Sequence, residues 1–234
     1  MNNHGSKHLK VIILPLAILT ASGLIATGTP THAKTVCPAA DANPIVTVRI
    51  QPGKVTLNNA RSQNGLLQLH RNKSNMKRAM GWNPVGLTST ELGFSMKVRI
   101  NAKPVRRGKY CGFLDSVNAS IGYEQLIVYV ARKYRPGSCH YASIMEHEKL
   151  HVLVFRRALQ RYAPRIEHRL KRVAATLRPV VTKTPEAAAT RLKNKLRQEV
   201  QPLFKEMNRE LNRTNAKLDT AENYKREQAR CSNW

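Results

Sequence analysis

The chain has 234 residues and carries 40 lysines and arginines against 14 aspartates and glutamates, which gives a formal net charge of +26 at pH 7. An excess of positive charge on this scale concerns solubility and partners, and it leaves the fold open. The default interpretation is a solvated basic face that keeps the protein soluble, and the functional alternative is attachment to an anionic surface, such as a cell-envelope polymer, or a preference for acidic substrates. Nucleic acid is not expected as a partner, because no aromatic-rich basic platform accompanies the charge.

Residues 1–33 have the layout of a secretory signal peptide. A short basic segment precedes the apolar run Val11–Ala26, and small residues follow at Thr31–Ala33. A retained membrane anchor is the alternative, which Pro15 and the modest apolar length disfavour. We therefore predict a secreted or periplasmic bacterial protein that has no stable membrane span once the signal peptide is cleaved.

The mature chain, residues 34–234, is long enough for a single domain with a strand-rich half, 34–137, and a helical half, 138–234. Its cysteines are Cys37, Cys111, Cys139 and Cys231. An even number of cysteines in an exported chain predicts two disulfides, and four cysteines allow three pairings. Their spacing fits no zinc knuckle, so a structural cysteine–zinc site is not expected.

The strand-rich half contains three segments with the pattern of β-strands. Ile45–Ile50 alternates apolar and polar residues, and so does Gly93–Lys103, whereas Tyr123–Tyr134 is almost continuously apolar. Tyr110–Tyr123 could form a further strand between the last two. Leu57–Pro84 is rich in Asn, Ser and Arg and is expected to form loops. Strands this close in sequence predict an antiparallel meander.

The helical half begins at a clear signal. Pro136-Gly137 is typical of a turn, and Ser138 is a good N-cap for a helix that starts at Cys139. Pro164 is expected to end or kink that helix, and a second helical stretch runs from Arg165 to Leu177.

A third helix is predicted from Thr184 as N-cap and Pro185 at the first helical position. It is expected to run to about Arg230, with a bend at Pro202. A single apolar stripe marks its packing face: Leu192, Leu196, Val200, Leu203, Met207, Leu211 and Leu218. The predicted fold class is therefore α+β, a small antiparallel sheet followed by long helices.

The first of these helices carries His147-Glu148-Lys149-Leu150-His151, an HExxH motif. Positions i and i+4 share a helix face, so His147 and His151 can direct nitrogens at one zinc ion. Glu148 projects about 100° away from His147, where it can act as general base on a zinc-activated water. The alternative is that both histidines are solvated surface residues.

An HExxH helix that follows an antiparallel sheet, in an exported chain, resembles the zincin metallopeptidases. More narrowly, it resembles the bacterial family of predicted secreted zinc-dependent proteases, over roughly residues 86–231. The resemblance implies peptide-bond hydrolysis at one zinc ion per chain. The family's return motif corresponds here to Leu218–Tyr224, which matches it at Asp219. Metzincins are excluded, because Val154 and Arg157 replace their glycine and third histidine.

The third zinc ligand could be Glu167, His168, Asp219 or Glu222. If Cys139 is bonded to Cys231 and their two helices are antiparallel, leaving Cys37 with Cys111, then position 223 lies level with His147 and Asp219 with His151. We favour Glu222 over Asp219 as the ligand, because side chains lean toward the helix N-terminus. The alternative is that both acids are solvated and pair with nearby lysines.

The remaining candidates have simpler interpretations. Tyr224 is expected to pack rather than to stabilise an oxyanion, and His70 and His140 are expected to be surface or packing residues. The sequence thus predicts an exported zinc peptidase that acts on a peptide or protein substrate. The rival hypothesis is a non-catalytic basic protein that binds anionic polymers of the cell envelope.

Overall fold

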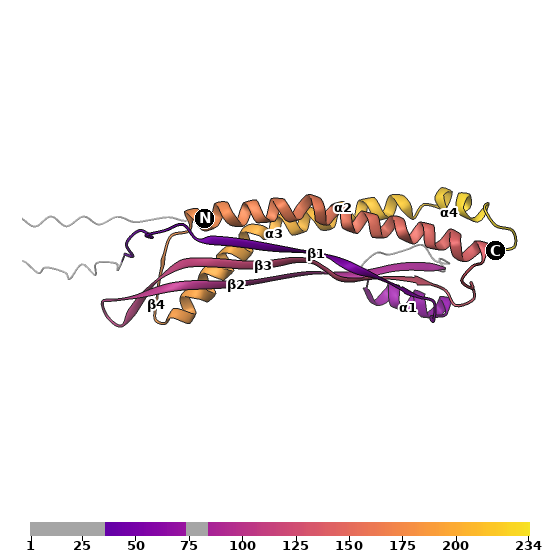
Figure 1. Cartoon of the computed structure of the whole chain (residues 1–234). Coiled ribbons are helices and arrows are strands. Elements are labelled where there is room, and N and C mark those ends of the chain that lie inside the picture. Colours follow the sequence, from indigo (N-terminus) through magenta and orange to yellow (C-terminus); the bar gives the residue numbers. More distant parts are fainter. Residues whose placement is uncertain (1–35, 74–83) are drawn as a thin grey trace, which may run out of the picture. The chain divides into compact units, whose positions relative to one another are not determined.

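The computed structural model describes residues 36–73 and 84–234, and this part of the chain is an α+β unit, as predicted. The predicted signal peptide, residues 1–33, lies outside the described residues. The sheet contains β1 (Ile45–Asn58), β2 (Gly86–Val105), β3 (Lys109–Val130) and the short β4 (Val180–Thr182). The helices are α1 (Gln63–Lys73), α2 (Cys139–Thr176), α3 (Pro185–Leu218) and α4 (Ala221–Gln228) (Figure 1).

The sheet is mixed, and the predicted meander is wrong for its first strand. β2 and β3 form the expected antiparallel hairpin, whereas β1 lies parallel to β3 on the other side, so that the strand order is β1-β3-β2. β1 ends opposite Tyr129 of β3 and β2 begins opposite Val130, so the chain passes from one side of β3 to the other at a single end of the sheet.

Two further expectations about this half need correction. Tyr110–Tyr123 and Tyr123–Tyr134 are not separate strands, because a single strand, β3, runs from Lys109 to Val130. The segment expected to form loops contains α1, whose first turn is capped by the Ser62 hydroxyl accepting from the Gly65 amide. Leu66 of α1 is fully buried, and this contact with the core stabilises the helix.

α2 and α3 lie side by side along one face of the sheet, and α1 lies on the other face (Figure 1). α2 does not end at Pro164, which was one of the two predicted outcomes there, and it includes all but the last residue of the stretch expected to form a second helix. Proline removes one hydrogen bond, to the carbonyl of Gln160. Both residues lie on the exposed side of α2, so solvent can satisfy that carbonyl.

The predicted apolar stripe of α3 is confirmed. Five of its seven residues, Leu192, Leu196, Val200, Met207 and Leu211, are buried. Three ion pairs also connect the exposed sides of α2 and α3: Arg161–Glu210, Arg165–Glu206 and Arg169–Glu199. Because their side chains are partly exposed, these pairs contribute less to stability than the buried stripe does.

The expected single helix to Arg230 is broken after Leu218. Thr220 caps α4 by accepting from the Asn223 amide, and the Asn223 side chain donates to the carbonyls of Lys217 and Leu218. These bonds satisfy groups that a helix end leaves without partners. The chain consequently turns at Asp219 and places α4 beside the start of α2.

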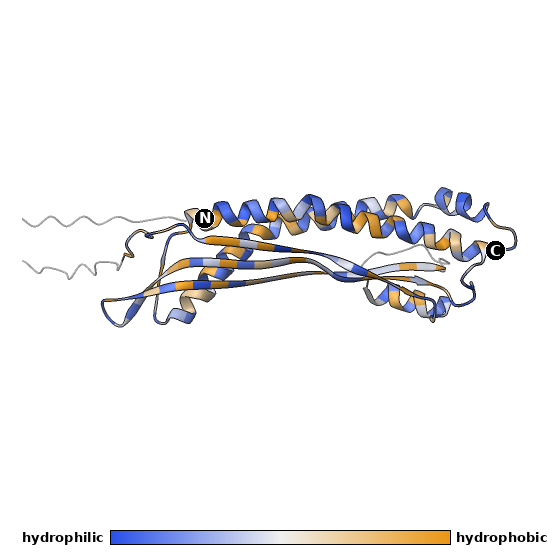
Figure 2. Ribbon diagram, viewed as in Figure 1, coloured by the Kyte–Doolittle hydropathy of each residue, from blue (hydrophilic) through white to orange (hydrophobic). Residues whose placement is uncertain are grey.

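The two disulfide pairings supposed in the sequence analysis, Cys37–Cys111 and Cys139–Cys231, are both present. Disulfides of this kind are typical of proteins outside the reducing cytoplasm. Polar residues are distributed along all the helices (Figure 2). None of the helices in residues 36–73 and 84–234 has a stretch long and apolar enough to cross a bilayer.

The buried stripe provides a direct test of the helix packing. Leu196→Ala is expected to lower the free energy of unfolding by about 3 kcal/mol, because Leu196 is fully buried and alanine leaves a cavity. Leu153→Ala, the same change on α2 at a side chain that is 43% exposed, should cost less than about 0.5 kcal/mol. Urea unfolding followed by circular dichroism measures both values. Equal losses would contradict this packing.

Candidate metal centre

The two histidines of the HExxH motif are buried and point at each other. They lie one turn apart near the start of α2, 6% and 8% exposed, and their Nε2 atoms are 3.0 Å apart. Solvated surface histidines, which were the alternative interpretation, would be exposed. The helix begins at Cys139, directly after its N-cap Ser138, whose hydroxyl accepts a hydrogen bond from the Tyr141 amide.

Asp219 completes the group from the opposite side. Its Oδ1 lies 3.3 Å from Nε2 of His147 and 3.3 Å from Nε2 of His151. Glu222, the favoured third ligand, is exposed on α4 and lies outside the group. That preference assumed a continuous helix through residue 222. Because α3 ends at Leu218, the turn directs Asp219 inward, and the preference must be corrected in favour of Asp219.

The spacing of these three atoms fits a metal ion. Tetrahedral zinc with bonds of about 2.0–2.1 Å separates its ligand atoms by about 3.3–3.4 Å, close to the observed 3.0–3.3 Å. Among the described residues, one group of His, Cys, Asp and Glu side chains has this arrangement. The three residues could therefore hold a divalent cation.

The Nδ1 atoms of both imidazoles are hydrogen-bonded to other side chains, which leaves the Nε2 atoms for a metal ion. His147 Nδ1 lies 2.9 Å from a Glu227 carboxylate oxygen, and His151 Nδ1 lies 2.9 Å from the Asn215 side-chain oxygen. Both partners are acceptors, so the neutral form of each imidazole keeps its proton on Nδ1, and Nε2 can offer a lone pair to a metal ion once its own proton is displaced. Hydrogen bonds of this kind orient metal-binding imidazoles and increase their basicity.

The electrostatics of the group also favour a cation. Burial opposes protonation of His147, but the hydrogen bond to Asp219 and the charges of Glu148 and Glu227 raise its pKa to about 9. Burial raises the pKa of Asp219, yet the two histidines more than offset this and hold it far below its usual range. Three of the 14 acidic residues in a strongly basic chain meet here. A metal ion would compete with protons for the same lone pairs.

Glu148 lies against the sheet rather than within the group of three. It is 4% exposed, burial raises its pKa, and the Thr88 hydroxyl of β2 donates to its Oε2 at 2.7 Å. Gly86 allows this close approach, because a Cβ there would lie 2.5 Å from Oε1 of Glu148 and 2.6 Å from Ile144. The sheet thus holds the carboxylate beside the histidines.

A cavity of about 170 Å³ opens in front of these residues. His147 and Glu148 line one side of it, Tyr224 lines another, and Val85 and Ile144 provide apolar surface. The HExxH acid and one HExxH histidine therefore face the same small space, which can admit part of a ligand.

The other residues that the sequence analysis considered are not part of the group of three and have different contacts. Tyr224 packs on the His147 ring and donates to Asp219 at 2.6 Å. His140 packs against Tyr134 and Trp234, and His70 is buried in α1. Glu167 pairs with Lys171, and His168 is exposed, both more than three turns along α2 from His151.

Three contributors were missed by reasoning from the sequence: Glu227, Asn215 and Thr88. Each is a polar residue in a segment whose local pattern does not distinguish it from a solvated position. The register set by Cys139–Cys231 would have identified one of them, because it brings Glu227 level with Ser143, and the Ser143 hydroxyl does donate to the Glu227 carbonyl at 3.2 Å.

The fold and the site define an α+β protein with two disulfides and a His-His-Asp group, its two histidines buried, that could hold a metal ion. Comparisons of the chain with protein-family models, with curated proteins and with solved structures found no match.

Proposed function

We propose that this protein is an exported zinc-dependent peptidase of the zincin type. The observation that carries the proposal is the placement of Glu148 on the same cavity as His147, next to the group His147, His151 and Asp219. Exported location is supported by the two disulfides and by the signal-peptide pattern of residues 1–33.

Zinc suits the ligand set of two imidazoles and one carboxylate, and when bound it would polarise a carbonyl and acidify a water ligand. Two histidines and a carboxylate also bind iron(II) in oxygenases. Hydrolysis is favoured here because a buried carboxylate, which such an oxygenase does not require, lies beside the site.

The side chains have separate roles in this proposal. His147, His151 and Asp219 hold the metal, while Glu227 and Asn215 orient the two imidazoles through their Nδ1 protons. Glu148 is the general base, held at the cavity by Thr88. The basic surface supports a preference for acidic proteins or attachment to an anionic cell-envelope polymer.

Metal analysis followed by a cleavage assay tests the proposal. We expect one zinc per chain in the oxidised protein, and cleavage of unfolded casein that stops on treatment with a chelator and returns with zinc but not with magnesium. Zinc is expected to be specific because the donor set contains two nitrogens, whereas magnesium prefers oxygens. A folded, disulfide-bonded protein that binds no zinc would overturn the proposal and favour the non-catalytic envelope-binding protein.

A further inference from the structure

The residues that complete the candidate site from the C-terminal side lie beyond the last buried residue of the chain. The buried stripe of α3 ends at Leu211, and none of residues 212–234 is buried. Asn215, Asp219, Tyr224 and Glu227 all belong to this final segment. Hydrophobic packing therefore fixes α3 on α2 but stops before the first residue that contacts the two histidines.

α4 in particular has little apolar surface with which to bind α2. Its sequence, Ala221–Gln228, is hydrophilic nearly throughout (Figure 2). The noncovalent ties of α4 and the residues after it to α2 include the bond from Ser143 to the Glu227 carbonyl and the contacts of His140 with Ser232 and Trp234. Another is the ion pair between Glu146 and Arg230, whose side chains are 66% and 55% exposed. An ion pair this exposed contributes little.

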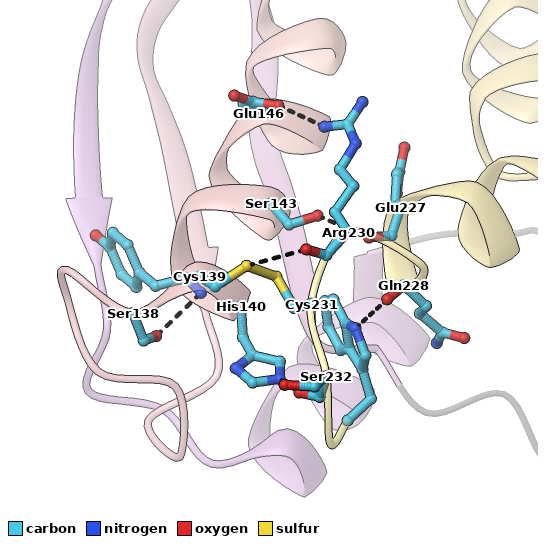
Figure 3. Close-up of a disulfide and its surroundings, with 12 residues drawn as sticks. Ser138, Cys139, His140, Ser143, Glu146, Glu227, Gln228, Arg230, Cys231 and Ser232 are labelled. Atoms are coloured by element: carbon cyan, nitrogen blue, oxygen red, sulfur yellow. Dashed lines mark hydrogen bonds and ion pairs between the residues drawn. A yellow bond between two sulfur atoms is a disulfide. The ribbon is translucent and has the colours of Figure 1, made fainter.

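The covalent tie is the Cys139–Cys231 disulfide (Figure 3). It joins the first turn of α2, two turns before His147, to the chain just past the end of α4, one turn beyond Glu227. In Figure 3, the segment that carries Glu227, Arg230 and Cys231 lies beside the first turns of α2, next to Ser143 and Cys139. The disulfide therefore holds in place the helix that delivers Glu227 to His147 and Tyr224 to Asp219.

We propose that the Cys139–Cys231 disulfide controls the metal affinity of the site, so that its reduction weakens metal binding while the domain stays folded. The inference rests on the proposed function, because it needs the site to bind zinc. Two molecules of a thiol such as glutathione reduce the disulfide to two cysteine thiols and leave as oxidised glutathione. With α3 still anchored by its buried stripe, residues 212–234 can then move away from α2.

The coupling must be reciprocal. If the intact disulfide increases the affinity for zinc by some factor, zinc favours the oxidised state of this disulfide over the reduced state by the same factor. A tenfold coupling corresponds to a shift of about 30 mV in the midpoint for reduction. The Cys37–Cys111 disulfide, which joins the segment before β1 to β3, is outside this linkage and serves as an internal control.

The test compares two matched double variants, Cys139→Ser/Cys231→Ser and Cys37→Ser/Cys111→Ser, in a zinc competition assay with a chromogenic chelator. We expect the first variant to bind zinc at least about tenfold more weakly than the oxidised wild type, a loss typical of disturbing the partners of metal ligands. The second should bind as the wild type does. Helical circular dichroism of both variants establishes that the domain is folded.

A glutathione redox titration with cysteine alkylation and mass spectrometry supplies the reciprocal measurement. Zinc should shift the midpoint of Cys139–Cys231 toward more reducing buffers and leave Cys37–Cys111 unchanged. His147→Ala should abolish the shift. Equal zinc affinity of the folded Cys139→Ser/Cys231→Ser variant and the wild type would overturn the inference, whereas failure of the oxidised wild type to bind zinc would overturn the proposed function itself.

Discussion

Asp219→Ala is expected to lower the affinity for zinc by at least about 100-fold, whereas Glu222→Ala leaves it unchanged. Asp219 supplies the oxygen that lies 3.3 Å from both imidazole nitrogens, and alanine offers no donor in its place. Loss of a direct ligand should exceed the 10- to 100-fold cost of losing an outer partner. Glu222 is three residues away and exposed, so its removal changes charge without touching the site.

Isothermal titration with zinc measures both variants, and His147→Ala provides the reference for a site without a nitrogen ligand. Both acids lie close to the junction of α3 and α4, which makes them a matched pair for effects on local helix structure. Loss of affinity in Glu222→Ala with retention in Asp219→Ala would restore the ligand first favoured by the sequence and would contradict the geometry of the turn.

The location of the site follows from one feature that can be read from the sequence and from one cysteine pairing that the sequence analysis could only suppose. The HExxH spacing places His147 and His151 on one helix face, and the pairing of Cys139 with Cys231 brings the far end of the chain level with them. This register placed Asp219 opposite His151, as the structure does. It failed at Glu222, because a register argument assumes that the helix continues.

The break between α3 and α4 had a local signal. Thr220 precedes Asn223 by three residues, which is the spacing of a capping interaction. The Thr220 hydroxyl accepts from the Asn223 amide at the start of α4, and the Asn223 side chain donates to the Lys217 carbonyl at the end of α3. The longer apolar stripe of α3, which ends with Leu218, suggested instead that one helix runs on. The capping bonds determine that the helix breaks, because no residue after Leu211 is buried and packing therefore adds little to the stability of a continuous helix.

The partner of β1 could not be deduced in the same way. Alternation in Ile45–Ile50 predicts a strand with one face on the core, and it does so equally beside β2 or beside β3. The choice depends on contacts such as those of α1 with β2 and with the core. These contacts are distant in sequence, whereas the hairpin of β2 and β3 depends on a short turn and was predicted correctly.

Glu148→Gln is expected to keep zinc bound and to reduce cleavage by about 10²- to 10⁴-fold, the usual contribution of a general base. Glutamine has nearly the same shape and can still accept the Thr88 hydroxyl, so the packing against Gly86 should survive. It cannot take a proton from water near neutral pH. Zinc content, with casein cleavage by the same preparation, measures both properties.

Glu146→Gln is the matched control, because Glu146 lies on the same helix, pairs with Arg230 and is 66% exposed. It should cleave at the rate of the wild type. If Glu148→Gln cleaves as fast as Glu146→Gln while both hold zinc, the carboxylate beside the histidines is not the base. The His-His-Asp group would then be a metal site without the proposed hydrolytic role, and the chemistry of the HExxH motif would have to be assigned to another residue on the cavity.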